Sequence, residues 1–324
     1  MSLLHVIRGA LLVSFSIIFT VVLGFGLPVF VNAIAKYCGF PETSTAECIV
    51  GVYLIFVLYI ATPRISRGSV KDQVGDGAKE LEEMNSDRMK VLQLDVCSEE
   101  QVEKAVEYVK THLEDPERGL WAVLNNAGVS TFGEVEFTTM DTYRHVSEVN
   151  LWGVIRITKA FLPLIRKAKG RVVNMASMYG RMGNAMRSSY CVSKYGVEAF
   201  SDCLRYEMKA WGVKVSIIEP GNFVVATGIL TRDIVSTTAE KLWREAPSGV
   251  QEEYGKGHFD KNIALMRSYC TGGLKDIQPV LDDITDAITS RRPFTRYNPM
   301  EPHLWIRMQV MTYLPALISD FLYF

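Results

Sequence analysis

The feature that most limits the fold of this chain is an alternation of helical and strand-like segments between about residue 76 and residue 221. The strand-like segments are short and apolar, and the helical segments carry an apolar stripe. Strands that alternate with helices predict an α/β fold, in which helices cover both faces of a doubly wound parallel sheet. The expected strands are 90–96, 119–128, 170–177 and 212–221, and the expected helices are 76–85, 98–113, 138–168 and 188–211. The active site of such a fold lies at the carboxyl ends of the strands.

The first 72 residues differ in kind from the rest. Residues 9–35 and residues 48–63 carry no charged side chain, and about 20 apolar residues suffice to cross a bilayer. We therefore expect residues 1–72 to form an apolar helical hairpin that anchors the chain in a membrane, ahead of a folded domain at 73–324. Basic residues outside both runs favour a topology with both ends on the cytoplasmic-type side. Two alternatives stay open: a signal peptide for the first run and a buried core helix for the second.

Charge and cysteine usage exclude several kinds of partner. The 324 residues include 35 basic and 36 acidic side chains, a net charge of −1, which gives no electrostatic reason to expect nucleic acid as a partner. The six cysteines form no C-x-x-C pair, and we expect free thiols in a reducing compartment. The five histidines are scattered, so we expect no metal site.

The strongest chemical signal is the segment SSYCVSKYG, which places Tyr190 and Lys194 four residues apart on an expected helix. Their side chains then share a face of that helix. A phenol has a pKa of about 10, and a cationic lysine nearby lowers it, so that Tyr190 can exchange a proton with a substrate alcohol or carbonyl. The alternative is a surface tyrosine beside an unrelated lysine, because Y-x-x-x-K is common by chance.

Three further segments accompany this pair in the predicted fold. Ser177 ends the strand 170–177, where its hydroxyl can hydrogen-bond the reacting oxygen, and NNAG (125–128) follows another strand at the same edge. Asn150 lies on the intervening helix, in NLWG. These segments, together with EPG at 219–221, resemble in order and spacing the short-chain dehydrogenase/reductase family. The resemblance covers about residues 73–324 and implies a Rossmann-like fold and an oxidoreductase that acts on CH–OH groups.

The resemblance also implies roles for single residues. Tyr190 would be the general acid/base, Lys194 would lower its pKa and contact the nicotinamide ribose, and Ser177 would orient the substrate oxygen. Asn150 would hold a water in a proton relay towards Lys194. The implied cofactor is NAD, with NADP not excluded. The residues implied to bind it are Asp95, Asn125, Ala127, Gly128, Tyr190, Lys194, Pro220 and Gly221.

Some of these cofactor residues have a more specific implied role. Asp95 would contact adenine, Asn125 would brace the central strands, and Pro220-Gly221 would close over the nicotinamide. The alternative for Asp95 and Asn125 is a strand-end cap or a turn.

The substrate is indicated by Arg187, which lies three residues before Tyr190 at the mouth of the expected site. A guanidinium there can pair with a small carboxylate, as a hydroxy acid requires; the alternative is a solvated surface arginine. Within the family, segments such as STFGEVEFT and FLPLIRKAKGRVVN resemble the branch that interconverts 3-hydroxybutyrate and acetoacetate. The retinol and hydroxysteroid branches are the alternative. Residues 222–270 lack core-like periodicity, and we expect a substrate loop with short helices there.

One part of the family pattern is missing from this sequence. The family begins with a strand, a T-G-x-x-x-G-x-G loop that receives the pyrophosphate, a helix and a second strand. Such a βαβ unit takes about 30 residues or more, yet Asp95 lies only 32 positions after Pro63, and most of those residues belong to 76–85 and 90–96. We therefore expect a sheet that is incomplete at its N-terminal βαβ unit, and impaired cofactor binding. The strand 90–96 would either pair with the free edge of 119–128 or stay peripheral.

Two hypotheses of different class follow. The chain is either a membrane-attached, NAD-dependent oxidoreductase of a hydroxy acid or secondary alcohol, or a non-catalytic, membrane-anchored remnant or splice variant. Membrane lipid and a homo-oligomer are further expected partners. The apolar tail 303–324 can dock on lipid, cover the pocket or pack as an ordinary C-terminus. The resemblance favours the mitochondrial inner membrane, and the endoplasmic reticulum is the alternative.

Overall fold

The computed structural model describes residues 90, 92–113 and 115–323. The expected membrane hairpin at 1–72 and the expected helix at 76–85 lie outside these residues. Within the described ranges, no helix is both long and apolar enough to cross a membrane.

Four parallel strands form one sheet in the described part of the chain. They are β1 (Ala122–Asn125), β2 (Arg171–Met175), β3 (Lys214–Ile218) and β4 (Arg296–Tyr297), and they lie side by side in chain order. The register pairs Asn125 with Asn174 and Asn174 with Ile217, so the carboxyl ends of β1, β2 and β3 lie together. The predicted α/β fold with a parallel sheet is confirmed.

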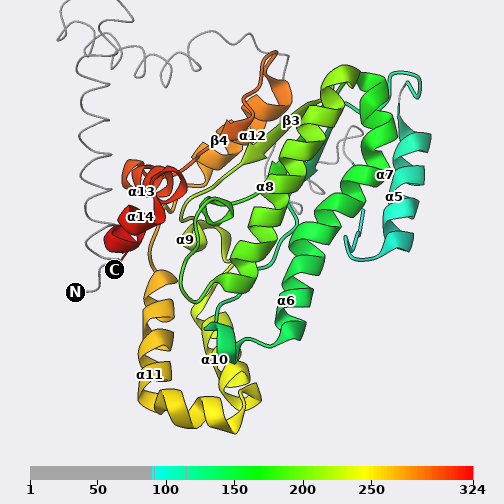
Figure 1. The fold of residues 1–324 in the computed structure, drawn as a ribbon. Helices are drawn as coiled ribbons and strands as arrows, with labels where there is room; N and C mark the ends of the chain where they lie inside the picture. The colour runs from blue at the N-terminus through cyan, green and yellow to red at the C-terminus, as the bar shows by residue number, and fades with distance from the viewer. Residues whose placement is uncertain (1–89, 91, 114, 324) are drawn as a thin grey trace, which may run out of the picture. The chain divides into compact units, whose positions relative to one another are not determined.

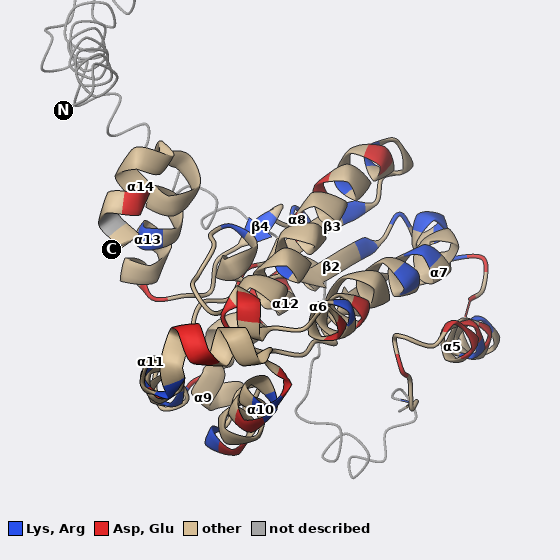
Figure 2. Cartoon of the chain, turned by 60° about the horizontal axis from the view of Figure 1, so that its bottom comes forward, with Lys and Arg blue, Asp and Glu red and all other residues tan. Residues whose placement is uncertain are grey.

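Helices lie on both faces of this sheet, as Figures 1 and 2 show. On one face are α5 (Glu99–His112), α7 (Gly153–Ala168) and α8 (Ser188–Met208), and on the other is α12 (Gln278–Thr289). The remaining elements are η3 (Val135–Phe137), α6 (Met140–Ser147), η4 (Glu148–Trp152), η5 (Met178–Gly180), η6 (Lys209–Trp211), α9 (Val224–Thr227), α10 (Arg232–Glu245), α11 (Ser248–Tyr269), α13 (Pro302–Tyr313) and α14 (Ala316–Tyr323).

The side chains of β2 explain why both faces are covered. Successive residues of a strand point to opposite faces of the sheet. Val172 belongs to the same buried cluster as Ile165 of α7, whereas Val173 belongs to the cluster that includes Val280 of α12. Because β2 is apolar on both sides, it is stable only with helices on both sides.

The strand expected at 90–96 is wrong for the residues that the structure describes there. Residues 92–95 have no regular secondary structure, and a turn begins at Val96. The segment packs against helices instead. The Val96 side chain lies against Gly153, the first residue of α7, so closely that a Cβ on Gly153 would come within 2.7 Å of it. Arg156 of α7 also donates to the Val96 carbonyl oxygen at 2.6 Å. Among the described residues, β1 therefore has β2 as its strand partner and no strand on its other edge.

Helix α5 begins after a serine, a residue that is typical of helix N-caps. Ser98 is the N-cap, and its side chain accepts a hydrogen bond from the backbone N–H of Gln101 at 3.3 Å. In a complete capping box Gln101 would accept from the Ser98 N–H. Here Gln101 Oε1 accepts from the backbone N–H of Asp95 at 2.8 Å, while the Ser98 N–H donates to the Asp95 carbonyl oxygen.

Residues 222–270 are more ordered than the sequence suggests. Two long helices, α10 and α11, lie side by side at the bottom of Figure 1 and share a buried cluster that includes Val235, Leu242 and Phe259. A kink at Gly255, whose φ is +74°, divides α11 into two segments. Because the kink interrupts the helical periodicity of the sequence at Gly255, the sequence predicted short helices in a loop where the structure has long ones.

The C-terminal tail forms α13 and α14, which pack on the segment between β2 and α8. Met308 is fully buried with Met178 and Met182, and the Tyr323 hydroxyl accepts from the backbone N–H of Ala185 at 2.7 Å. Other side chains stay open to solvent, and Phe321 is 83% exposed. Whether this face meets lipid stays a prediction.

Candidate active site

Tyr190 and Lys194 lie together on α8, one helical turn apart, facing the carboxyl end of β2. Lys194 Nζ lies 5.7 Å from the centre of the Tyr190 ring and donates to the carbonyl oxygen of Met175, the last residue of β2, at 2.8 Å. Ser177 follows β2 and is hydrogen-bonded to Tyr190 through its side chain. All three of these candidate catalytic side chains are buried. The structure therefore brings together the three groups that the sequence singled out from different segments.

The charges around this group differ from the expected ones. Burial raises the pKa of Tyr190 above its usual value, and the positive charge of Arg187 and the Ser177 hydrogen bond act against that rise. Arg187 is thus a cation beside Tyr190 to which the sequence assigned no effect on the phenol, and the expected effect of Lys194 on the Tyr190 pKa stays a prediction. Burial lowers the pKa of Lys194 itself to about 8, against the opposing effect of Glu198. Tyr190 is therefore a neutral phenol at pH 7, able to donate a proton.

Asn150 is fully buried in the π-helix η4, where the long predicted helix 138–168 widens between α6 and α7. Such π-turns recur at functional sites. Its amide holds the loop after β1 from both sides: Oδ1 accepts from the Val129 N–H at 2.8 Å, and Nδ2 donates to the Val129 carbonyl at 2.9 Å. Nδ2 also contacts Ser193 Oγ on α8 at 3.1 Å. The proton-relay role of Asn150 stays a prediction.

The loop that Asn150 holds lies close to Lys194 at Gly128. A Cβ on Gly128 would lie 3.3 Å from Asn150 Oδ1 and 3.8 Å from Lys194 Nζ. A side chain at this position would therefore fill the space beside the amine. The preceding residues, Asn126 and Ala127, are exposed. Backbone without a side chain beside Lys194 fits the close approach of a flat ligand ring at this point.

Asn125 lies at the end of β1 and ties the sheet to α7. Its Nδ2 donates to Asn174 Oδ1 on β2 at 2.7 Å and to Thr158 Oγ1 on α7 at 2.9 Å. The Asn174 amide in turn donates to Ser201 Oγ on α8 at 2.8 Å. A buried polar chain thus crosses from β1 to α8, in keeping with the bracing role expected for Asn125.

Asp95 lies in a turn, which was the alternative to a cofactor-binding role. Its side chain is a turn cap, with Oδ1 accepting from the Cys97 N–H at 2.9 Å, and the residue is exposed. At the opposite end of the site, the Pro220 carbonyl oxygen accepts from the Met178 N–H at 3.0 Å, so the EPG segment lies against the Ser177 loop. Contacts of Asp95 with adenine and of Pro220-Gly221 with nicotinamide stay predictions.

Arg187 is buried beside Tyr190, which rules out a solvated surface arginine. Its guanidinium carbon lies 5.0 Å from the Tyr190 ring centre and 5.8 Å from that of Tyr179, and Nη2 donates to Ser130 Oγ at 2.8 Å. Nη1 is also buried and has no hydrogen-bond partner in the described structure. A buried guanidinium N–H without an acceptor is costly, so this atom calls for an anion or a polar ligand group.

Three residues around Arg187 were missed by the sequence reading. Met186 has φ of +62°, a left-handed conformation that is rare for residues other than glycine, and it directly precedes Arg187, the N-cap of α8. Ser130 could have been found, because it follows NNAG at the same sheet edge. Tyr179 carries no signal of its own in the sequence, since its place depends on the turn η5.

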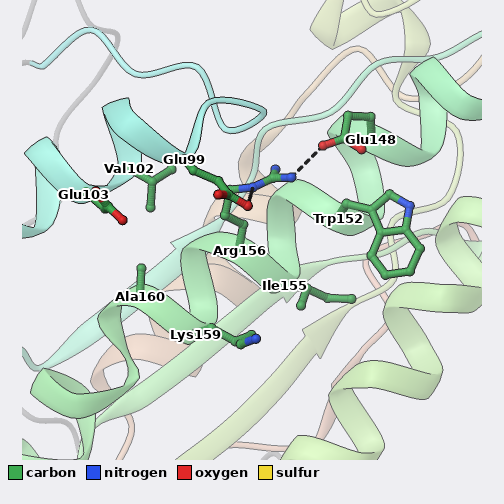
Figure 3. A pocket seen from close by; sticks show the side chains of 9 residues that line it. All are labelled: Glu99, Val102, Glu103, Glu148, Trp152, Ile155, Arg156, Lys159 and Ala160. Carbon is green, nitrogen blue, oxygen red and sulfur yellow. Dashed lines mark hydrogen bonds and ion pairs between the residues drawn. The ribbon is translucent and has the colours of Figure 1, made fainter.

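A separate cavity of about 570 Å³ lies on the outer side of α7 (Figure 3). Its wall comes from α5, η4 and α7, and Arg156 is paired there with Glu148 at 2.6 Å. Its lining residues are Glu99, Val102, Glu103, Glu148, Trp152, Ile155, Arg156, Lys159 and Ala160. None of the predicted site residues is among them, so this cavity is separate from the candidate site around Tyr190.

A parallel α/β sheet with a buried Ser–Tyr–Lys group at its carboxyl edge defines an oxidoreductase of the dehydrogenase type. The family comparison agrees: residues 66–233 match the short chain dehydrogenase family. The chain belongs to that family, and is an oxidoreductase by descent that acts on CH–OH groups.

The relatives are similar over most of their length. The chain is 56% identical over 255 residues to D-beta-hydroxybutyrate dehydrogenase, mitochondrial, of Bos taurus, covering 78% of this chain and 74% of the relative. It is 42% identical over 245 residues to retinol dehydrogenase 7 of Rattus norvegicus, covering 75% of each. A crystal structure of a short-chain dehydrogenase from Streptomyces avermitilis has the same fold, with a TM-score of 0.54, 23% identity and coverage of 70% of this chain and 76% of that one.

Proposed function

We propose that this site is built to interconvert a 3-hydroxy acid of the 3-hydroxybutyrate type and its keto acid, with NAD as the cofactor. The observation that carries this proposal is the buried Nη1 of Arg187, which lacks a partner beside Tyr190. A substrate carboxylate would satisfy that N–H, and a charge-assisted bond of this kind contributes about 1.5–3 kcal/mol. Retinol and hydroxysteroids carry no carboxylate and would leave it unsatisfied. The similarity to D-beta-hydroxybutyrate dehydrogenase supports the same substrate class.

The residues of the chain divide the work as follows. Arg187 binds the carboxylate, and Ser177 holds the oxygen that reacts. In the reduction, the neutral Tyr190 donates its proton to the substrate oxygen and becomes a phenolate, which the Lys194 cation favours. In the oxidation, that phenolate accepts the proton of the substrate hydroxyl and becomes neutral again. NAD, when bound, supplies the hydride acceptor. Burial of Tyr190 and Lys194 keeps water away from the reacting oxygen.

The described residues fit the nicotinamide end of the cofactor but include no site for its pyrophosphate. The space left by Gly128 beside Lys194 suits the nicotinamide and its ribose. For the pyrophosphate, the sequence offers no T-G-x-x-x-G-x-G loop, and none of the described strands precedes β1. We therefore propose that this chain binds NAD weakly and turns over slowly or not at all. A membrane-anchored, non-catalytic protein that keeps the site residues is the second candidate, and the same missing loop favours it.

We further propose a membrane location. The uncharged runs at 9–35 and 48–63 support an anchor. The names of the bovine and rat hydroxybutyrate dehydrogenases state a mitochondrial location for those proteins, which supports mitochondria for this chain, with the endoplasmic reticulum as the alternative.

The substrate class is tested by replacing Arg187 in a chimera that carries the missing strand–loop–helix–strand of a relative between Lys71 and Asp72. Arg187→Ala should raise the KM for 3-hydroxybutyrate roughly tenfold or more, because an ion-assisted bond of about 1.5–3 kcal/mol is lost. The KM for 2-butanol, which has no carboxylate, should change little. Arg291→Ala is the matched control, because Arg291 is exposed on the surface. An equal rise in KM for both alcohols would show that Arg187 does not bind a carboxylate.

A further inference from the structure

Two buried glutamates lie behind the catalytic lysine. Glu198 is one helical turn after Lys194 on α8, and Glu219 follows β3 directly. Arg296 of β4 holds both, since its guanidinium donates to Glu198 Oε2 at 3.1 Å and to Glu219 Oε1 at 3.0 Å. Glu219 is fully buried and Glu198 is 6% exposed. Two carboxyl groups are thus withdrawn from water around one shared cation.

Other charged and polar groups complete this cluster. Arg181 of the Ser177 loop donates to Glu219 at 3.2 Å, and Arg296 donates to Asp202 on α8 at 2.7 Å. The further groups that face the cluster are Arg205, which donates to Asp202, Asn298, which donates to Glu219, and Tyr313 of α13, which accepts from Arg181. Glu219 accepts from three donors, whereas Glu198 accepts from Arg296 through Oε2 alone. Glu198 is therefore the less compensated carboxyl.

The Oε1 atom of Glu198 explains how the pair is stable. It is buried and accepts from no donor in the described structure, although Glu198 and Glu219 meet at the same Arg296 guanidinium. Two buried carboxylates on one cation repel each other, and a proton on Glu198 removes that repulsion and turns the buried Oε1 from an acceptor without a partner into a donor. Burial and the negative charge of Glu219 raise the pKa of Glu198 to about 8, which fits a proton on Glu198 at neutral pH.

We infer that Glu198 and Glu219 share one proton at neutral pH, and that Glu198 is a positioning residue that sets the charge of Lys194. Lys194 is buried, and Glu198 is the group whose negative charge opposes the effect of that burial on the amine. When the pair loses its proton, the new charge on Glu198 stabilises the Lys194 cation one turn away. The catalytic amine then keeps its charge to a higher pH than its burial alone would allow. This inference rests on the role of Lys194 in the proposed function.

Two substitutions with opposite expected effects test it in the full chain. In Glu198→Gln the opposing charge is gone, so the pKa of Lys194 should fall by about 1 pH unit, a modest effect for a nearby opposite charge. In Glu219→Gln the like charge beside Glu198 is gone, Glu198 ionises at neutral pH, and the pKa of Lys194 should rise. Carbon-13 NMR of labelled lysine side chains measures it, with the Lys194 signal assigned through Lys194→Arg.

The shared proton has its own readout. At pH 7 the infrared spectrum of the unmodified chain should contain the C=O stretch of a buried carboxylic acid, and that band should be absent from both glutamine variants. Asp202→Asn is the matched control, because it removes a carboxylate from the same Arg296 without removing one beside Lys194; the band should persist and the Lys194 midpoint should stay nearly unchanged.

Either of two results would overturn the inference: no acid band at pH 7, or a Lys194 midpoint that moves equally in Glu198→Gln and Asp202→Asn. If Glu198→Gln fails to fold, the band in the unmodified chain and its loss in Glu219→Gln still decide. Neither measurement needs bound NAD or turnover. The inference can therefore be tested even if the chain is inactive. If the inference fails, the proposed reaction is not contradicted.

Discussion

The polar chain that starts at Asn125 should contribute strongly to the stability of the domain. In Asn125→Ala, Asn174 Oδ1 and Thr158 Oγ1 lose a donor, and these two residues are 0% and 1% exposed. A buried acceptor without a partner costs about 1–3 kcal/mol. The Thr158 hydroxyl can rotate to another partner, so Asn174 bears most of the cost. We expect the free energy of unfolding to fall by about 2–4 kcal/mol in all.

Urea unfolding of the full chain, followed by intrinsic tryptophan fluorescence, measures this loss. The transition midpoint should fall by roughly 1 M with an unchanged slope, because slopes for domains are about 1–3 kcal/mol per M. Asn126→Ala is the control, since it removes the same side chain from an exposed neighbouring position and should change stability by less than about 0.5 kcal/mol. Similar losses in both variants would refute the view that the buried amide braces β1, β2 and α7.

Three further outcomes are expected. Lys169→Gly should stabilise the domain by about 1 kcal/mol in urea unfolding, because Lys169 is the C-cap of α7 and has a φ of +47°, which glycine adopts without strain. Lys167→Gly, inside the helix, should destabilise the domain. A destabilising Lys169→Gly together with a stabilising Lys167→Gly would contradict a left-handed C-cap at Lys169. The pKa of Lys194 falls from 10.5 to about 8 on folding, so between these pH values the unfolded chain binds more protons and stability rises with pH. The unfolding free energy of Lys194→Met minus that of the unmodified chain should therefore fall by up to about 3 kcal/mol from pH 8 to pH 10.5. A constant difference would show that folding does not lower the pKa of Lys194. The full chain should stay in the membrane pellet after alkaline carbonate washing, and release into the supernatant would exclude a hairpin that spans the membrane.

The sequence predicts well those parts of the fold in which local patterns and packing agree. β2 and β3 are short segments whose residues are mostly buried, and α8 buries one face that includes Val197, Leu204 and Met208, so their place in an α/β fold follows directly. The segment 90–96 has the same apolar pattern but forms no strand where it is described. A strand needs a partner on the sheet, and here Val96 finds helix α7 instead. Pattern alone does not say which surface an apolar segment meets.

The candidate site likewise contains residues that the sequence predicts and residues that it does not. Tyr190 and Lys194 are predictable because helical spacing alone puts them on one face, and Ser177 because it ends a strand. The neighbours of Arg187 are not, since they depend on a left-handed Met186 and on a turn at Tyr179. The carboxyl pair was not predicted either, because Arg296 lies about 100 residues after Glu198 in the chain and meets it only through β4, a strand of two residues.

The central claim is that this chain keeps the catalytic half of a short-chain dehydrogenase site without the loop that holds the pyrophosphate. Calorimetric titration with NADH tests it most directly, comparing the full chain with the chimera that carries a relative's strand–loop–helix–strand between Lys71 and Asp72. Loss of two or three charge-assisted bonds of about 1.5–3 kcal/mol each should weaken binding by at least about 100-fold relative to the chimera. Micromolar binding of NADH by the chain without the insert, together with oxidation of 3-hydroxybutyrate, would contradict the claim and mean that another segment binds the phosphates.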